Sequence, residues 1–546
     1  MNTSSHASTA DESTQVLIIG GGLVGLSMSL FLSNHGIASV LIERHPGTAI
    51  HPRAMGFTPR TMELFRAVGA EEAIHRVEPP VPEDSGTLLV DSLVGQTFDN
   101  FQEDIRSLFF IEDSPARGSA IAQDLLEPVL RKRAEELGGD LRFGCELLTF
   151  EQDDEGVTAR VRERASGNIR TLRARYLVAA DGSQSPIRQR LGIGQHGSGS
   201  MGHFISMIFE ADLMRLFRER HAVMCFVSND IVPIGSLVPY PGSSARPDLF
   251  RVDVGYDPDA ETLADYPEER CLGLIRAAVG LPALPVRLKS VLTWEMNALV
   301  ADRFQQGRIF LVGDAARTQP PSGGLGGNTG IAEAHNLAWK LALVLRGEAG
   351  AELLATYDLE RRPLADYTAE QMALLSQQRQ TEGSAGITVD IASVNAGYRY
   401  GSGAFVAEAD TAQLPLIQHW SRWQGQPGTH APHIVLEHAG RTSSTLDLPV
   451  SRFVLLVGPA GQSWREAARN LQRSQPLPLD VYQIGGAAGD FLVADNSFCQ
   501  AYGLASSGAV LLRPDGFIGW RSARAGEHGE EDEAALARAL STLLFQ

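Results

Sequence analysis

The feature that most constrains the fold of this chain is a patterned run near its N-terminus, QVLIIGGGLVGLSMSLFLSNHG, followed shortly by SVLIER. Residues Gln15–Ile19 are apolar and rich in β-branched side chains, which predicts a buried strand. Gly20, Gly22 and Gly25 follow at once in a GxGxxG spacing and lead into a helical stretch. A second apolar strand then ends in Glu43. Strand, glycine turn, helix, strand and acid in this order predict a doubly wound α/β domain.

Each part of this pattern has a physical role in binding a dinucleotide. Gly20 permits the turn, Gly22 lets a pyrophosphate touch the backbone, and Gly25 lets helix and strand pack closely. The helix N-terminus offers free N–H groups and a positive dipole end, and Glu43 is placed for a ribose hydroxyl pair. The pattern does not distinguish FAD from NAD. An empty domain whose glycines serve only packing is the alternative.

Two later strands each deliver an aspartate to a turn. In RYLVAADGSQSPIRQRLG, the strand Tyr176–Ala180 leads to Asp181 and then to Ser185 and Arg188 on a helical stretch. In RIFLVGDAA, a further strand delivers Gly313-Asp314 to the loop RTQPPSGGLGGNTG. Six glycines and two adjacent prolines stand in the span 313–340, directly ahead of and within a predicted helix. So many glycines indicate that something lies against this backbone.

Composition and charge bound the class of protein. The chain has 546 residues, enough for roughly two to four domains with a substantial core. Its net charge of −18 argues against nucleic acid or an anionic membrane surface as the main partner. The four cysteines have neither CxxC nor zinc spacing, so no metal site is expected and a reducing cytoplasm is favoured. The apolar run 16–32 follows acidic residues, which argues against a signal peptide, and no membrane span is predicted.

The three motifs together resemble those of flavin-dependent aromatic hydroxylases, the single-component class with a p-hydroxybenzoate-hydroxylase-like fold. The order and spacing agree from Gln15 to about Gln378, and the pattern is most similar to the subgroup acting on polyketide and other multi-ring aromatic substrates. The resemblance implies an α/β fold, in which a GxGxxG Rossmann-like FAD-binding domain carries an inserted β-sheet substrate domain and a thioredoxin-like C-terminal domain. The expected divisions are a disordered tail (1–14), the FAD-binding domain (15–191 and 295–383, with part of 75–115 on the substrate side), the substrate domain (192–294), a linker (384–427) and the C-terminal domain (428–546).

The resemblance also implies how FAD is held. Asp314 would bind the ribityl chain, and the loop Pro320–Asn328 would lie beside the isoalloxazine. The helix from about Gly327 to Leu345 would point its positive end at the flavin pyrimidine edge, where it stabilises the reduced ring. Arg53 would contact a FAD phosphate or the nicotinamide cofactor. The FAD contacts expected in all are Gly20, Gly22, Leu23, Val24, Gly25, Glu43, Arg44, Arg53, Gln123, Leu147, Asp181, Gly313, Asp314, Pro321, Gly324, Gly326, Gly327 and Asn328.

Three positions depart from the family pattern. The chain has Arg317 where His usually follows GDAA, Gly327 where many members have Met or Leu, and Glu333 where Asp is usual. Arg317 could act on substrate charge or flavin mobility, or could simply pair with a nearby acid.

In such enzymes NAD(P)H reduces FAD, oxygen adds at flavin C4a, and the distal oxygen of the hydroperoxide passes to an electron-rich ring carbon. NADPH or NADH docks transiently, which agrees with the lack of a second dinucleotide motif. A base would help to ionise a phenolic substrate, and the candidates are Tyr240, His203, His221 and His51, each of which could instead be structural. The expected partners are a small aromatic substrate, O2 and NAD(P)H, with a monomer or homodimer.

Two other functions stay open. A flavin-dependent oxidase or dehydrogenase would use the same fold without inserting oxygen, and a binding or escort protein would not need FAD. The C-terminal third has PDG at Pro514–Gly516 as a strand turn, and its single Cys499 makes thiol redox work improbable. A structural or association role is therefore expected for it.

Overall fold

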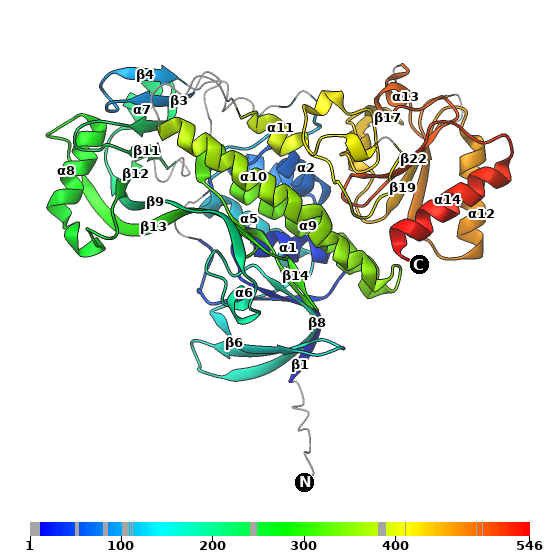
Figure 1. Ribbon diagram of the computed structural model, residues 1–546, viewed down its shortest axis with the longest axis horizontal. Helices are drawn as coiled ribbons and strands as arrows, with labels where there is room; N and C mark the ends of the chain where they lie inside the picture. The colour runs from blue at the N-terminus through cyan, green and yellow to red at the C-terminus, as the bar shows by residue number, and fades with distance from the viewer. Residues whose placement is uncertain are drawn as a thin grey trace, which may run out of the picture.

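The computed structural model describes residues 11–49, 54–79, 86–100, 109, 111, 113–240, 248–380, 389–409, 411–486, 489–493 and 495–546. Three lobes meet around two long central helices, α9 (Leu325–Arg346) and α10 (Thr356–Gln380) (Figure 1). One lobe carries the N-terminus, and the C-terminus lies in another.

The first lobe is built on an eight-stranded sheet in the order β14-β15-β8-β1-β2-β5, to which β7 and β6 add through β8. Strands β15, β8, β1, β2 and β5 run parallel, as a doubly wound domain requires. Helix α1 packs against both α5 and α9, and the three helices share one apolar core with the sheet. The strands are β1 (Glu12–Ile19), β2 (Ser39–Glu43), β5 (Asp140–Phe143), β6 (Cys145–Gln152), β7 (Val157–Glu163), β8 (Ile169–Ala179), β14 (Gln305–Gln306) and β15 (Ile309–Leu311); the helices are α1 (Leu23–Asn34), α2 (Pro59–Ala67), α3 (Glu71–Val77), α5 (Gln123–Glu136) and α6 (Pro186–Arg190).

The second lobe is a separate eight-stranded sheet in the order β16-β13-β9-β12-β11-β10-β3-β4. Along β9 and β12 the side chains alternate between two faces. The face with Met207, Phe209 and Val252 forms a core of its own under α7 and α8. The other face looks towards the first lobe. The elements are β3 (Gly86–Val90), β4 (Thr97–Asn100), β9 (Gln195–Glu210), β10 (Ala222–Val227), β11 (Gly235–Pro239), β12 (Leu249–Tyr256), β13 (Arg287–Ala301), β16 (Arg317–Thr318), α7 (Met214–Glu219) and α8 (Glu268–Val279).

The third lobe holds a four-stranded mixed sheet in the order β20-β19-β21-β22, with α12 and α14 in contact on one side. Its core joins that of the first lobe, because Trp339 of α9 meets Phe453 of β19 edge to face, with ring centroids 6.0 Å apart. The PDG turn links β21 to β22. The elements are β17 (Val435–His438), β18 (Arg441–Ser444), β19 (Phe453–Val457), β20 (Leu479–Gln483), β21 (Ala509–Leu512), β22 (Ile518–Ser522), α12 (Gln462–Ser474), α13 (Ser497–Ala501) and α14 (Gly529–Leu544). The short helix α11 (Ile391–Ala396) instead packs on α9 and α10.

Buried charges tie this third lobe to the central helices. Arg513, beside the PDG turn, binds Glu360 of α10 through two N–H···O contacts of 2.8 and 2.9 Å and also pairs with Asp515. Lys340 of α9 lies 2.8 Å from the same Glu360 carboxylate. All four side chains are buried, so the C-terminal lobe is an integral part of the fold.

Two expected divisions differ from the structure. Residues 12–14, assigned to the tail, belong to β1, because their backbone pairs with β8. The described residues between 389 and 427 are more than a linker: α11 forms there, and Tyr400 stacks on Phe517 with centroids 4.4 Å apart. These aromatic residues pack between α10 and the C-terminal sheet. Because the contacting residues are far apart in the sequence, no local periodicity in the sequence predicts them.

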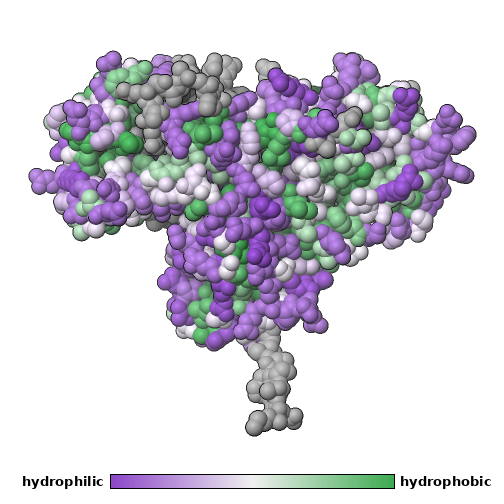
Figure 2. All heavy atoms as spheres, viewed as in Figure 1, coloured by the Kyte–Doolittle hydropathy of each residue, from purple (hydrophilic) through white to green (hydrophobic). Residues whose placement is uncertain are grey.

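On the face drawn in Figure 2, hydrophobic residues lie in scattered groups among hydrophilic ones. Within the described residues, no helix has the length and apolar character needed to cross a membrane.

Candidate active site

One large cavity, of about 2910 Å³, extends between the first two lobes. At one end it is lined by the GxGxxG turn and the strand ends around it. At the other it is lined by the open face of the second sheet, including Phe204, Ser206 and Trp294. The same space therefore joins a dinucleotide-binding turn to a pocket large enough for an aromatic molecule.

The three sequence motifs converge at one edge of the parallel sheet. Ile19 of β1 is in register with Ala179 of β8 and Ile42 of β2, and Ala179 is also in register with Leu311 of β15. Each strand ends there, and the residues that follow line the cavity. The carboxyl edge of such a sheet is where doubly wound folds bind ligands.

The three glycines of the first motif differ in what surrounds them. Gly20 has φ +109°, and a Cβ there would lie 2.2 Å from the Ala180 carbonyl oxygen, so the turn itself requires glycine. A Cβ on Gly25 would lie 1.9 Å from the Gly20 oxygen. At Gly22 the nearest atom would be Glu127 Oε1 at 3.8 Å. Gly22 therefore leaves open space at the start of α1, which fits a pyrophosphate lying against the backbone.

Glu43 is held in place by the turn that it faces. Its Oε2 accepts a hydrogen bond from the Gly21 N–H at 2.6 Å, and its Oε1 accepts one from the His45 N–H at 2.8 Å. The side chain lines the cavity beside Arg44. This position fits the ribose contact that the sequence predicts.

Asp181 combines burial with local hydrogen bonding. Ser185 donates to its Oδ1 at 2.6 Å, and the Ile187 N–H donates to its Oδ2 at 3.2 Å. Burial raises the pKa of Asp181, and the Ser185 contact opposes that rise. Arg188 donates to the Ala315 carbonyl at 2.9 Å and so joins the Asp181 turn to the Asp314 turn.

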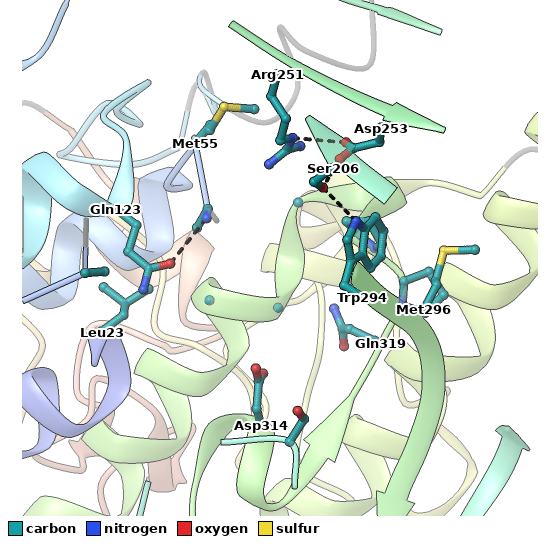
Figure 3. Close-up of a pocket in the computed structure, with 18 of the residues that line it drawn as sticks. Leu23, Met55, Gln123, Ser206, Arg251, Asp253, Trp294, Met296, Asp314 and Gln319 are labelled. Carbon is teal, nitrogen blue, oxygen red and sulfur yellow. Dashed lines mark hydrogen bonds and ion pairs between the residues drawn. The ribbon is translucent and has the colours of Figure 1, made fainter. Parts of the chain in front are cut away.

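The glycine-rich loop presents its backbone to the cavity. Asp314, Pro321, Gly324, Gly326 and Gly327 all line it (Figure 3 for Asp314). The helix α9 begins here without a side-chain cap, so its first N–H groups and positive dipole end face the same space. It starts two residues before the predicted Gly327.

Two buried polar atoms in this loop, Thr318 Oγ1 and Gln319 Nε2, find no partner among the described residues, although both residues line the cavity. An unpartnered buried donor is costly and fits a polar ligand.

Arg317 lies behind this loop, fully buried and outside the cavity lining. Its Nε donates to Glu333 Oε1 at 2.8 Å, and its terminal nitrogens donate to Gln319 Oε1 at 3.1 Å and to the Gly326 carbonyl at 2.9 Å. Glu333 Oε2 in turn accepts from the Gly313 N–H at 2.8 Å. Arg317 is therefore not placed to contact substrate, and the reading of an arginine paired with a nearby acid is the one that the structure favours.

At the GxGxxG end of the cavity, Gln123 of α5 accepts from the Ala54 N–H at 3.3 Å and donates to Glu127 at 2.7 Å. Leu147 of β6 lines the same region. Glu127 was not predicted from the sequence. It is buried, lines the cavity and also accepts from the Ala49 N–H at 2.7 Å, and burial raises its pKa. The only sequence signal was its position four residues after Gln123 on an amphipathic helix.

Several predicted contacts lie away from the cavity surface. Gly25 and Gly313 serve close packing against Gly20 and Val24. The Asn328 side chain is buried and fully engaged: its Oδ1 accepts from the Thr58 N–H at 2.9 Å, and its Nδ2 donates to the Gly324 carbonyl at 2.9 Å. Its side-chain amide holds the α9 start to the loop before α2, so only its backbone N–H, in the first turn of α9, is left for the predicted cofactor contact. Arg53 and His51 lie outside the described residues.

Among the base candidates, Tyr240 and His203 line the cavity and His221 does not. Burial raises the pKa of Tyr240 despite the opposing effect of Arg251, so its hydroxyl stays protonated at neutral pH. Its hydroxyl can therefore donate a hydrogen bond within the cavity. His203 Nε2 lies 3.4 Å from Ser200 Oγ and 3.9 Å from Glu295 Oε1.

Comparison with known protein families identifies the family of this chain. Residues 13–372 match the family described as "FAD binding domain", and residues 424–545 match "Aromatic-ring hydroxylase, C-terminal". The chain belongs to the FAD-dependent aromatic-ring hydroxylases. It is an FAD-dependent monooxygenase of aromatic compounds, so the reading as an escort protein without FAD falls away.

Known members of this hydroxylase family resemble the chain over almost its whole length. The 4-methyl-5-nitrocatechol 5-monooxygenase of a Burkholderia species is 42% identical and covers 98% of both chains. The tetracenomycin A2 monooxygenase-dioxygenase of Streptomyces glaucescens is 38% identical, covering 98% of this chain and 97% of its own. The crystal structure of aklavinone-11 hydroxylase with FAD and aklavinone superposes with a TM-score of 0.89 at 34% identity, covering 98% of this chain and all of that one.

The Arg317 contacts lead to a first prediction. Arg317→Lys keeps the charge opposite Glu333 but loses the branched donors to Gln319 and Gly326. We expect a folded protein whose FAD affinity falls about tenfold, because the loop is less firmly positioned. A fluorescence titration of the apoprotein with FAD measures this. Arg346→Lys, in an exposed pair at the other end of α9, is the matched control. An unchanged FAD affinity in Arg317→Lys would show that the loop needs no such brace.

Proposed function

We propose that this hydroxylase inserts one oxygen atom into a polycyclic phenolic or polyketide-type aromatic compound, using NADPH or NADH and O2. The observation that carries the proposal is the single cavity, which joins the dinucleotide turn to a broad sheet face. Its volume suits a fused-ring substrate together with the flavin. Relatives named for tetracenomycin and aklavinone support a multi-ring substrate, whereas the nitrocatechol relative shows that one-ring phenols occur in the family.

The described residues indicate how FAD would lie. Gly22 and the start of α1 would hold the pyrophosphate, and Glu43 would hold the adenosine ribose with Leu147 near the adenine. Gln123, Asp181 and Asp314 would lie beside the remaining part of FAD, which includes its ribityl chain. The backbone from 321 to 327 and the positive end of α9 would face the isoalloxazine.

When bound, FAD supplies the chemistry: it takes electrons from the nicotinamide and activates O2 for transfer to the ring. The protein supplies binding, orientation and exclusion of water. Phe204 and Trp294 stack with ring centroids 4.7 Å apart and form an aromatic wall of the cavity. Ile208, Leu292 and Met296 add apolar surface around that wall. A flat aromatic substrate would lie between this aromatic wall and the isoalloxazine ring of FAD.

The electrostatics of the cavity suit a substrate oxygen. Tyr240 offers a protonated hydroxyl, and His203 of β9 stands directly opposite Glu295 of the paired strand β13. No group in the described lining needs to act as a strong base, because a donor can favour the ionised phenol directly.

The test follows flavin reduction and product mass together. The FAD-loaded protein is mixed in a stopped-flow instrument with NADPH or NADH and a panel of simple and fused-ring phenols. We expect flavin reduction that at least one fused-ring phenol accelerates, with a product heavier by one oxygen atom. Substrate oxidation without gain of oxygen would instead support a flavin-dependent oxidase or dehydrogenase.

We further propose that the enzyme works in the cytoplasm as a monomer or homodimer. All four cysteines are free, and Cys225, Cys271 and Cys499 are buried, as fits a reducing compartment.

A further inference from the structure

A polar cluster interrupts the open face of the second sheet. Alternation along β12 sends Phe250, Val252 and Val254 into the core beneath, and it sends Arg251 and Asp253 towards the cavity. Apolar residues such as Ile208 and Leu292 surround them on that face. A carboxylate in such a place must be paired, because burying a lone charge is costly.

Asp253 is paired on both sides by the strand register. Ser206 of β9 and Ser236 of β11 stand directly opposite it. Ser236 Oγ donates to Oδ2 at 2.9 Å, and Ser206 Oγ donates to Oδ1. Arg251 Nε lies 3.0 Å from Oδ2 (Figure 3). Asp253 is 4% exposed, accepts hydrogen bonds from both serines and is ion-paired with Arg251, so its carboxylate is fully engaged within the sheet.

The direction of hydrogen bonding in this cluster is determined by Trp294. Its indole Nε1 donates to Ser206 Oγ at 2.9 Å, and an indole can only donate. Because Ser206 Oγ accepts this bond, the Ser206 hydroxyl donates its hydrogen bond to Asp253. The chain Trp294, Ser206, Asp253 holds the carboxylate in one orientation, and the carboxylate holds Arg251 at the cavity wall.

Tyr240 completes the cluster from the end of β11. Its side chain lines the cavity with Arg251, whose positive charge opposes the rise in the pKa of Tyr240, and the hydroxyl hydrogen can be donated to an acceptor in the cavity. Burial raises the pKa of Tyr240 and keeps that hydrogen in place. Arg251 and Tyr240 thus present donors to the cavity beside the Phe204–Trp294 wall.

Building on the proposed function, we propose that Arg251 and Tyr240 form a subsite for a phenolic oxygen of the substrate and favour its ionised form. An ionised phenol is a better nucleophile towards oxygen transfer than the neutral one. The subsite would thus do the work for which a base was expected, and it would orient the ring along the aromatic wall.

Other charged groups face this subsite. Asp253 on the same strand offsets the Arg251 charge, and Asp124 of α5 lies near enough to Tyr240 to raise its pKa. Farther along β9 and β13 stand His203 and Glu295. A positive Arg251 within about 4–6 Å of a phenol oxygen is expected to lower the pKa of that phenol by about one to three units.

The test uses 4-nitrocatechol, a phenol whose visible absorption separates its neutral and ionised forms. The probe is titrated into oxidised, FAD-loaded protein without NAD(P)H at a series of pH values. We expect the wild type to bind it with the pKa of the probe lowered. Arg251→Gln keeps side-chain donors without charge, and Arg251→Met removes both. In each, the pKa of the bound probe should rise by about one to three units relative to wild type, with at least about tenfold weaker binding of the ionised form.

The controls separate the subsite from general effects. Arg287→Met makes the same change on an exposed arginine of the same sheet, outside the cavity, and should behave as wild type. Tyr240→Phe should give a smaller shift in the same direction. The visible spectrum of bound FAD shows that each variant is folded, and Arg251→Lys, which should retain part of the effect, serves if neither of the larger changes folds.

Three results would overturn the subsite: a wild type that binds only neutral probe, one that binds no probe, or an Arg251→Gln that binds ionised probe as wild type does. The proposed function is judged apart from these, by the gain of oxygen during turnover. If the product gains oxygen but Arg251→Gln binds the ionised probe as the wild type does, only the subsite is rejected. If the pKa of the bound probe is lowered in the wild type but no product gains oxygen, only the hydroxylation is rejected.

Discussion

Gly22→Val should fold as the wild type does and lose FAD. The backbone at Gly22 has φ −80° and ψ −172°, a region open to any residue, so valine creates no backbone strain. Its side chain would project into the cavity at the start of α1, where the pyrophosphate is expected to touch the backbone. We expect FAD to bind about 100-fold more weakly, from about 3 kcal/mol of steric overlap. Flavin fluorescence during titration of the apoprotein measures this.

Gly273→Val is the matched control for this change. Gly273 lies in α8 away from the cavity, and a Cβ there would meet no described atom within 4 Å. It should bind FAD with the affinity of the wild type. A Gly22→Val protein that also retains that affinity would show that the pyrophosphate lies elsewhere.

Arg513→Met should lower the free energy of unfolding by more than the substitution of an exposed charged residue does. Arg513 is fully buried and neutralises Glu360 and Asp515, which are buried with it. Removing it leaves two buried carboxylates without the cation that pairs with both, at a cost of about 3–5 kcal/mol. The urea midpoint, followed by circular dichroism, should fall accordingly. Arg452→Met breaks a half-exposed pair with Asp480 in the same lobe and should cost at most about 1 kcal/mol.

The same cluster gives a pH dependence. Burial alone would raise the pKa of Glu360 and of Asp515, but the positive charges of Arg513 and Lys340 together outweigh burial and hold both pKa values below their ordinary range. Because the folded pKa values lie below the unfolded ones, this stability is present above about pH 4 and is lost as the pH falls further. The gap between wild type and Arg513→Met should therefore narrow below about pH 4. A gap that stays constant from pH 7 to pH 3 would mean that these carboxylates are not ionised in the folded protein.

Local patterns in the sequence predicted the strands and turns that surround one end of the cavity. The strand that ends at Ile19, the turn glycines and the strands before Asp181 and Asp314 are encoded in short runs, because turn geometry and strand burial act over a few residues. Parallel pairing then brings their ends together, as the registers of β1, β8 and β15 confirm.

The other features of the site depend on contacts between segments that are far apart in the sequence, so local patterns could not predict them. Asn328 was expected at the cofactor, but its amide is taken by Thr58, which stands 270 positions away. The Asp253 cluster arises from register between β9, β11 and β12, and no single strand reveals it. Arg317 could be read two ways until Glu333 was found beside it.

The measurement that tests the account most directly is turnover under oxygen-18 gas. The FAD-loaded enzyme, NAD(P)H and the phenol that best accelerates flavin reduction are incubated, and the product is analysed by mass spectrometry. The account predicts one heavy oxygen atom in the aromatic product, taken from O2. A product that is oxidised but carries no heavy oxygen, or whose new oxygen comes from water, would contradict it.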